Sequence, residues 1–186
     1  MFNRLVNRVG DRRVKNTEYE QFSTTPRMYD MDTAMLTSKD IAEYFLAQTD
    51  EDIGDFLTNH KVQKLVYWAQ GHHLALFDAP LFDKEIEAWV TGPTVPALFR
   101  EYKAKHGNGP IAMPTDFDFD KFSPGIKEFL DDVYNVYGQY APWKLRQMTL
   151  HEPPYYSAYK VMGGDCVISR EAMRDYFKMI DGKNDD

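Results

Sequence analysis

The sequence predicts a mainly α fold, a compact bundle of about six helices with one or two short β-strands. Apolar side chains recur at helical spacing over residues 59–77, and further stretches with the same period follow along the chain. Residues 86–90 alternate between apolar and polar side chains, which is typical of a short strand. Hydrophobic residues make up 43% of the 186 positions, so the chain has enough apolar surface to build a core.

Three segments are expected along the chain. Residues 1–35 form a basic N-terminal extension that we expect to be flexible, residues 36–180 form one globular domain, and residues 181–186 form a disordered tail. The formal net charge of the chain is −7, although residues 1–28 hold six Arg and Lys against three Asp and Glu. The acidic remainder argues against broad nucleic-acid binding, which needs a basic face. A nucleic-acid-binding regulator that uses the Arg-rich N-terminus stays open as an alternative.

The expected location of the protein is the cytoplasm. No apolar run approaches the roughly 18 residues that a membrane span requires, so no membrane partner is expected. The start of the chain lacks the apolar region of a secretory signal. The one cysteine, Cys166, excludes an internal disulfide and fits a reducing compartment.

The first helix of the globular domain is predicted to begin at Thr37 or Ser38. Either hydroxyl can cap a helix, and Asp40 places a negative charge near the positive helix end. The inward face is expected to consist of Ile41, Tyr44 and Phe45. Acidic residues 50–52 then predict an exposed loop.

The strongest pattern predicts a helix over residues 59–77. At 100° per residue, one broad apolar stripe forms from Val62, Leu65, Val66, Ala69, Leu76 and Phe77. His73 lies near the centre of this stripe, whereas Lys64 and Gly71 lie opposite, and Tyr67 and Trp68 lie at its flanks. The helix has more apolar and aromatic surface than one packing face needs, so other elements should cover the surplus.

The elements after this helix are shorter. A strand at 86–90 is predicted to end at Gly92–Pro93, a helix to run from Val95 to Gly107, and the phenylalanines of the loop at 108–122 to pin that loop onto the body. Ser123 should cap a helix that stops at Gly138. Pro142 suits the first position of the next helix, with Trp143, Leu145 and Met148 facing inward until residues 151–154 break it. Residues 167–168 suggest a second short strand, and Ser169 caps a last helix that reaches Ile180.

No catalytic site, metal site or cofactor is predicted. The histidine and cysteine spacings of known zinc sites are absent from the sequence, and the adjacent His72 and His73 diverge by about 100° on a helix. His73 is expected to be a core histidine held by a hydrogen bond. An enzyme, a small hydrolase that uses His73, Glu87 and His151, stays open as an alternative if folding brings these side chains together.

Aromatic residues near the predicted turns exceed what a core needs. Trp and Tyr bury a large area at low entropic cost and are enriched in protein interfaces. We expect Trp89 and Trp143 to belong to an aromatic core. For Trp68, Tyr155 and Tyr156, a core position and an interface position are both open.

Three stretches together resemble a known family: LVYWAQGHHLAL, PLFDKEIEAWVTGPTVPALFREYK and APWKLRQMTLHEPPY, at residues 65–76, 80–103 and 141–155. The resemblance is to the Panacea domain, the family of SocA-like antitoxins and phage-associated GepA-like proteins. Its structural motif corresponds here to Gln63, Lys64, Gln70, Gly71, His73, Glu87, Trp89 and Trp143. The sequence departs from the family pattern at His72 and Tyr155, where the family often has Trp, and at His151, which is shifted by one residue.

The resemblance implies a bacterial or prophage antitoxin of a type II toxin–antitoxin system. Such a protein neutralises a cognate protein toxin by direct binding, and one member of the family acts as an adaptor that delivers its toxin to an ATP-dependent protease. Partner contacts are expected from the flank of the main helix and from the turn before the next helix. The residues expected to bind the partner are Tyr67, Trp68, His72, Gly92, Pro93, Val95, Pro96, Arg100, Tyr155 and Tyr156. The identity of the toxin and the oligomeric state stay open.

Overall fold

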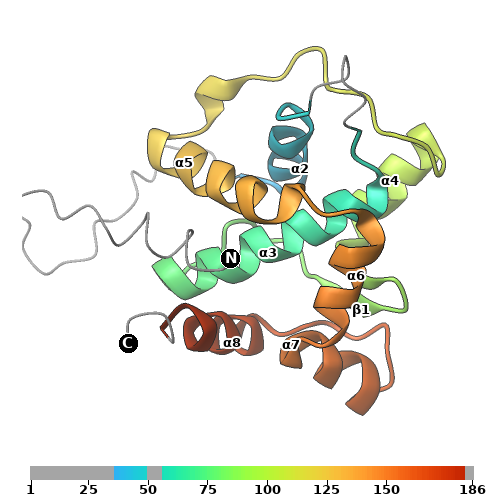
Figure 1. Cartoon of the computed structure of the whole chain (residues 1–186), viewed down its shortest axis with the longest axis vertical. Helices are drawn as coiled ribbons and strands as arrows, with labels where there is room; N and C mark the ends of the chain where they lie inside the picture. The colour runs from blue at the N-terminus through green and yellow to red at the C-terminus, as the bar shows by residue number, and fades with distance from the viewer. Residues whose placement is uncertain (1–35, 50–55, 183–186) are drawn as a thin grey trace, which may run out of the picture.

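A computed structural model describes residues 36–49 and 56–182 of the chain (Figure 1). The predicted extension at 1–35 and the acidic loop at 50–52 lie outside the described residues. The last helix, α8 (Arg170–Gly182), extends two residues beyond Ile180, where the sequence pattern ended it. Residues 183–186 lie outside the description. The predicted fold class, a mainly α bundle with little β-structure, is confirmed.

Helix α3 (Asn59–Phe77) runs through the middle of the molecule with the bounds that the apolar pattern predicted. Helices α2 (Ser38–Leu46) and α5 (Pro124–Val133) lie on one side of it and α8 on the other, as Figure 1 shows. Every residue from Lys61 to Leu74 is buried, so these turns have no solvent-facing side. The predicted surplus of apolar surface is therefore covered by neighbouring elements.

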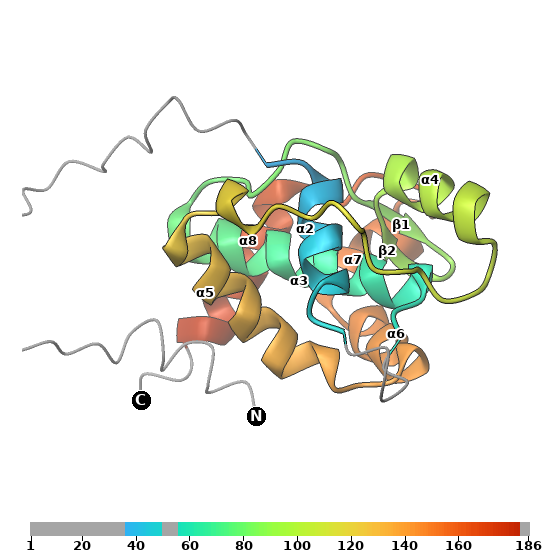
Figure 2. The ribbon, with the colours of Figure 1, turned by 90° about the horizontal axis from the view of Figure 1, so that it is seen from above.

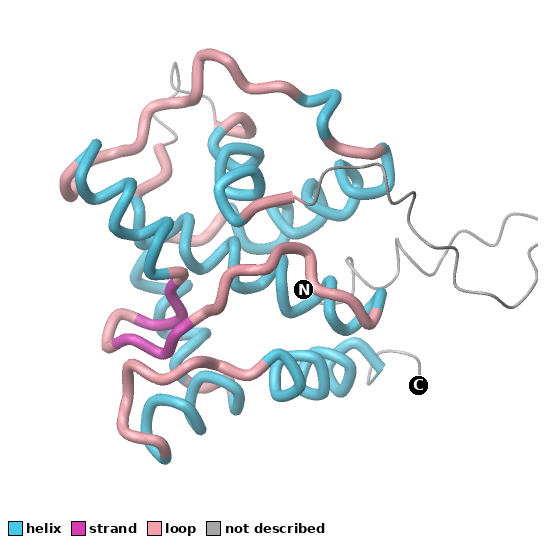
Figure 3. The backbone as a smooth tube through the Cα atoms, turned by 180° about the vertical axis from the view of Figure 1, so that it is seen from behind, coloured by secondary structure: helices cyan, strands magenta, loops and turns pink. Residues whose placement is uncertain are grey.

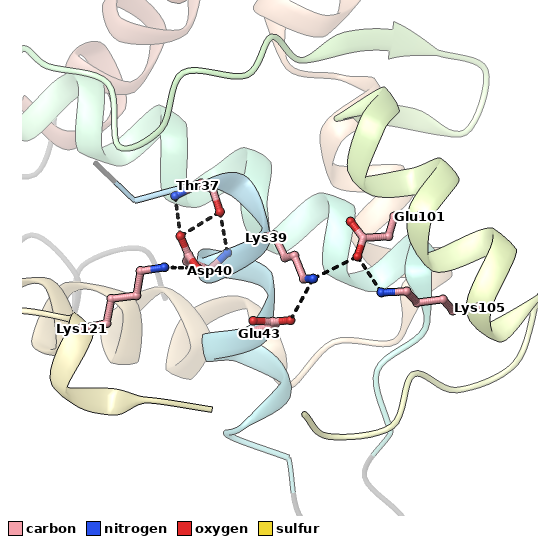
Figure 4. Close-up of polar contacts among 7 residues, drawn as sticks. All are labelled: Thr37, Lys39, Asp40, Glu43, Glu101, Lys105 and Lys121. Atoms are coloured by element: carbon pink, nitrogen blue, oxygen red, sulfur yellow. Dashed lines mark hydrogen bonds and ion pairs between the residues drawn. The ribbon is translucent and has the colours of Figure 1, made fainter. Parts of the chain in front are cut away.

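The helices begin at local signals that the sequence carries. Thr37 caps α2, and its side chain and that of Asp40 form a reciprocal capping box (Figure 4). Ion pairs then link α2 to its neighbours: Lys121 contacts Asp40 at 2.6 Å, and Lys39 contacts Glu101 of α4 (Pro96–His106) at 3.0 Å. Each such surface pair contributes about 1 kcal/mol or less, so the packing of α3 outweighs them.

Strands β1 (Glu87–Trp89) and β2 (Gly92–Thr94) form an antiparallel hairpin in which Ala88 pairs with Pro93. The expectation that Gly92–Pro93 only ends a strand was wrong, because these residues form the return strand. The strand predicted at 167–168 was also wrong. That segment makes an isolated bridge to the free edge of β1, in which the Ile168 amide donates to the Ile86 carbonyl at 2.8 Å. Backbone pairing too short for a regular strand therefore closes this edge.

The remaining elements pack around α3. In chain order they are α4 (Pro96–His106), the 3-10 turn η3 (Phe119–Lys121), the π-helical turn η4 (Tyr134–Gly138) that extends α5, α6 (Pro142–Leu150), the short α7 (Pro153–Tyr156) and the π-helical turn η5 (Ser157–Val161). Proline occupies the first turn of α4, α5, α6 and α7, where a missing amide proton costs no helical bond. Figure 2 shows α4, the hairpin and α6 gathered at one end of α3, and Figure 3 shows the hairpin in magenta at that end.

The predicted loop at 108–122 packs onto α2 as expected. The ring of Tyr44 lies within 6.1 Å, centroid to centroid, of those of Phe117, Phe119 and Phe122. The Tyr44 hydroxyl also donates to Asp131 of α5 at 2.7 Å. Tyr44 therefore joins the loop, α2 and α5.

Gly71→Ala is expected to destabilise the fold by about 1–3 kcal/mol, the usual range for an overpacked site. A methyl group added at Gly71 would lie 2.2 Å from Cε2 of Phe177 on α8, so α8 would have to move away from α3. Urea denaturation followed by circular dichroism measures the effect.

Gly125→Ala is the matched control, because a methyl group added there meets no atom within 4 Å. This change should leave stability unchanged or raise it by up to about 1 kcal/mol. Equal stabilities for the two variants would mean that α8 does not pack closely over Gly71.

Candidate functional site

Lys64 carries its amine into the interior beneath the hairpin. Its side chain is 1% exposed, and Nζ donates a hydrogen bond of 2.8 Å to the Pro93 carbonyl. Burial, reinforced by the charge of Arg146, lowers the pKa of Lys64 to about 7. The helical wheel placed Lys64 opposite the apolar stripe, but β2 and α6 cover that side of α3. The amine therefore titrates near neutral pH instead of remaining permanently charged.

Gly92 allows the hairpin to close over this lysine. Its φ of +102° is a conformation that residues with a side chain rarely adopt. A methyl group there would also lie 2.7 Å from Cε of Lys64. The Gly92–Pro93 pair thus supplies both the close approach and the carbonyl that Lys64 binds.

Two glutamines on the same helix hold the segments that follow it. Gln63 accepts a hydrogen bond from the amide of Val95, the N-cap of α4, at 2.8 Å. Gln70 accepts from the Leu81 amide at 2.9 Å and donates to the Phe82 carbonyl at 3.1 Å. Both side chains supply hydrogen-bond partners that the backbone groups of these turns would otherwise lack.

Glu152 is a second buried ionisable group at this end of the molecule. Its Oε1 accepts a hydrogen bond of 2.9 Å from the Trp68 indole, and the Trp68 ring stacks on Tyr137 at 4.0 Å. Burial raises the pKa of Glu152 to about 7, and the Tyr67 hydroxyl and Trp68 indole oppose this shift. Within the described part of the chain, the buried Oε2 of Glu152 and the buried hydroxyl of Tyr67 have no hydrogen bond of ordinary geometry. The sequence favoured a helix stop at residues 151–154, so the burial of Glu152 was missed.

Most of the residues predicted to bind a partner lie inside the protein. Those buried are Tyr67, Trp68, His72, Gly92, Pro93, Val95 and Tyr155, whereas Pro96 is half-buried and Arg100 and Tyr156 are exposed. Tyr67, Trp68 and His72, expected to contact the partner from the flank of the main helix, are not exposed there, because every residue of α3 from Lys61 to Leu74 is buried. His72 instead lies with Nε2 2.8 Å from the Tyr137 hydroxyl, and Tyr155 donates to the Trp89 carbonyl at 2.9 Å.

Trp143, in contrast, was predicted to be buried and is exposed. It was expected to face inward, but its side chain is 65% exposed. The inward face of α6 contains Leu145 and Thr149, and a residue two positions before Leu145 lies about 200° away from it on a helix. Trp89 is half-buried at the edge of the core, where its indole donates to Glu87 at 2.7 Å.

Exposed apolar side chains gather around the hairpin. Val90 at its turn is 61% exposed, and the Arg146 guanidinium of α6 donates to the Val90 carbonyl at 2.9 Å. Tyr156 on α7, which follows α6 and contacts it, is 51% exposed. We name Val90, Trp143, Arg146 and Tyr156 the hairpin face. Arg146 had no signal in the sequence, because its role depends on a backbone carbonyl distant along the chain.

The three residues considered for hydrolysis occupy separate surroundings. His73 is a buried core histidine, as predicted, with Nδ1 2.7 Å from the Ala79 carbonyl, and burial lowers its pKa. Glu87 lies on β1 and binds Trp89, whereas His151 is exposed at the end of α6. Among the described residues, no hydrogen bond or ion pair joins any two of the three. No group of three or more His, Cys, Asp or Glu side chains suited to hold a metal ion occurs over residues 36–49 and 56–182.

Comparison with known proteins yields one family. The family model described as antitoxin SocA-like, Panacea domain, matches residues 62–155, about half of the chain. This range contains Lys64, Gly92, Trp143, Arg146 and Glu152, and it leaves α2 and α8 outside. No curated protein and no solved structure matches the chain. None of the described helices has both the length and the hydropathy needed to cross a membrane.

Glu152→Gln is expected to change how stability depends on pH. Folding raises the pKa of this carboxyl from its ordinary value of 4.5 to about 7, so the folded chain binds more protons than the unfolded chain between these values. The free energy of unfolding therefore falls as pH rises through this window, by a total on the order of 3 kcal/mol. Gln keeps an acceptor for Trp68 and never ionises, so the variant should gain stability relative to the natural protein between pH 5 and pH 7.5.

Urea denaturation at the two pH values measures this difference. The exposed Glu171→Gln on α8 serves as the control and should follow the natural protein. If the free energy of unfolding changes with pH by the same amount in Glu152→Gln and Glu171→Gln, the raised pKa of Glu152 is contradicted.

Proposed function

The chain belongs to the SocA-like Panacea domain family of antitoxins, and from this premise we propose that it neutralises a cognate protein toxin by binding it directly. The observation that carries the proposal is the hairpin face, where a tryptophan, a tyrosine and a valine are more than half exposed. Tryptophan, tyrosine and arginine dominate the binding energy of protein interfaces. Exposing a tryptophan to this degree has no benefit for folding, since burial of its ring would stabilise the core.

The hairpin face is built on rigid elements, which suits a preorganised binding surface. Beneath it, Lys64 holds the Pro93 carbonyl and Gln63 holds the Val95 amide. Across it, Arg146 holds the Val90 carbonyl and Tyr155 holds the Trp89 carbonyl. These bonds fix both ends of the hairpin, so a partner meets Val90 and Trp143 without ordering a loop. The buried Gly92, Pro93 and Val95 then act through the hairpin, while Arg100 and Tyr156 remain available for contact.

Two variants test the proposal against the product of a neighbouring toxin gene. Trp143→Ala and Val90→Asp should each weaken the complex at least tenfold, because losing an interface hot spot costs about 2 kcal/mol or more. Both should also reduce the growth rescue that co-expression gives. Isothermal titration calorimetry on the purified chains measures the affinity, and circular dichroism confirms that each variant is folded.

Met179→Ala is the control, since Met179 is 46% exposed but lies on α8, outside the hairpin face. This variant should keep full affinity and full rescue. If Trp143→Ala and Val90→Asp also keep both, the toxin does not bind at the hairpin face. If no neighbouring gene product arrests growth or binds the chain, the proposed function itself is wrong.

The fate of the bound toxin separates simple blocking from delivery to an ATP-dependent protease. Blocking predicts a toxin half-life that is unchanged or lengthened by the antitoxin. Delivery predicts a half-life that the antitoxin shortens only in cells that contain the protease. Direct binding at the hairpin face is the first step of both.

A further inference from the structure

A small pocket opens beside Trp143, between α3, the turn of the hairpin and α6. Its volume is about 230 Å³, and its lining consists of His60, Lys64, Thr91, Pro142, Trp143 and Arg146. Three of these six side chains are basic and none is acidic. Arg146, together with Lys64 in its protonated form, therefore makes the pocket a positive spot on a chain whose net charge is −7.

The two strongest cations of the pocket have no carboxylate partner in the described part of the chain. Lys64 uses one of its N–H groups for the Pro93 carbonyl, and Arg146 uses Nη2 for the Val90 carbonyl. An ammonium group has three donors and a guanidinium group has five, so both side chains retain donors for a ligand. A buried amine without a counter-charge is costly, and it gains most from an anion placed beside it.

The remaining walls select the kind of anion. Pro142 and the exposed ring of Trp143 provide apolar surface beside the two cations. A volume of about 230 Å³ accommodates one side chain, and the acidic chain as a whole repels the polyanionic backbone of a nucleic acid. The best complement is thus a carboxylate on a short apolar stem, which a protein partner carries as Asp, Glu or its terminal carboxylate.

We propose that this pocket receives one carboxylate-bearing residue of the bound toxin, with Lys64 and Arg146 donating to the carboxylate and Trp143 covering its stem. The assignment rests on the proposed function and adds the chemistry by which the partner is recognised. It explains why a lysine is buried under the hairpin instead of an apolar residue of similar length.

The assignment has a consequence for pH. The pKa of Lys64 is lowered to about 7, so an incoming carboxylate must bind the protonated amine, which becomes scarce as pH rises above 7. The other groups that face Lys64 are Arg146 on α6 and His60 on α3. Burial, with the charges of Lys64 and Lys103, lowers the pKa of His60, so this ring is neutral throughout the range above pH 7. Binding should thus weaken by up to tenfold per unit between pH 7.5 and 8.5.

The first arm of the test needs no toxin. The full chain is titrated with 3-phenylpropionate and, separately, with its uncharged amide, while the three tryptophan indole N–H signals are followed by nuclear magnetic resonance. The carboxylate should shift one indole signal, assigned to Trp143 by its absence from Trp143→Phe, at concentrations at least tenfold lower than the amide. Equal effects of the two compounds, or equal binding of inorganic phosphate, would overturn the assignment.

The second arm uses the complex with the toxin. Lys64→Met should weaken toxin binding about tenfold and abolish its dependence on pH between 7.5 and 8.5. Arg146 lies at the exposed rim of the pocket, so Arg146→Gln should fold even if Lys64→Met does not. This variant should also weaken toxin binding about tenfold. Full affinity in Arg146→Gln would refute the pocket while leaving the antitoxin function intact. Binding of 3-phenylpropionate by a chain that binds no toxin would support the pocket and refute the antitoxin function.

Discussion

Helix α3 brings polar side chains into the interior along its whole length, and each of them needs a partner there. An unpaired buried polar group costs about 1–3 kcal/mol, so the surrounding elements must lie where these partners can be reached. The partners are the Pro93 carbonyl for Lys64, the Val95 amide for Gln63, the Leu81 amide for Gln70, the Ala79 carbonyl for His73 and the Tyr137 hydroxyl for His72. Apolar burial alone would hold the neighbours close to α3, and these bonds fix where along it each one lies.

This arrangement also accounts for what remains outside. Lys64 holds the hairpin from beneath through the Pro93 carbonyl, and Arg146 holds its turn to α6 through the Val90 carbonyl. Val90 and Trp143 are both exposed, and a pocket lined by Thr91, Trp143 and Arg146 lies beside the hairpin turn. The same two cations that position the hairpin therefore line the space that a partner can enter. With the proposed mode of binding, structure and recognition would depend on one set of contacts.

The sequence predicted the elements whose signals are local. Thr37, Ser123 and Pro142 mark helix starts through their own chemistry, and the apolar stripe of α3 fixes its bounds, so these were confirmed. The site was not predictable in the same way. A helical wheel ranks the faces of a helix against one another, but it does not say how many faces are covered, so it left Tyr67 as a candidate partner contact and Trp68 open between core and interface. Strands of three residues have too short a pattern to register, which hid the return strand at Gly92–Thr94.

Two buried groups of opposite charge, Glu152 and Lys64, both reduce the stability of this fold near neutral pH. The cost of ionised Glu152 develops as pH rises from 4.5 to about 7, and the cost of protonated Lys64 persists from low pH up to about 7. The two costs overlap most near pH 7, so the contribution of this pair to stability is lowest there. A partner carboxylate bound beside Lys64, as proposed, would remove one of the costs where their sum is greatest. Binding at the pocket would then stabilise the fold as well as the complex, which couples the stability of the free protein to the presence of its partner.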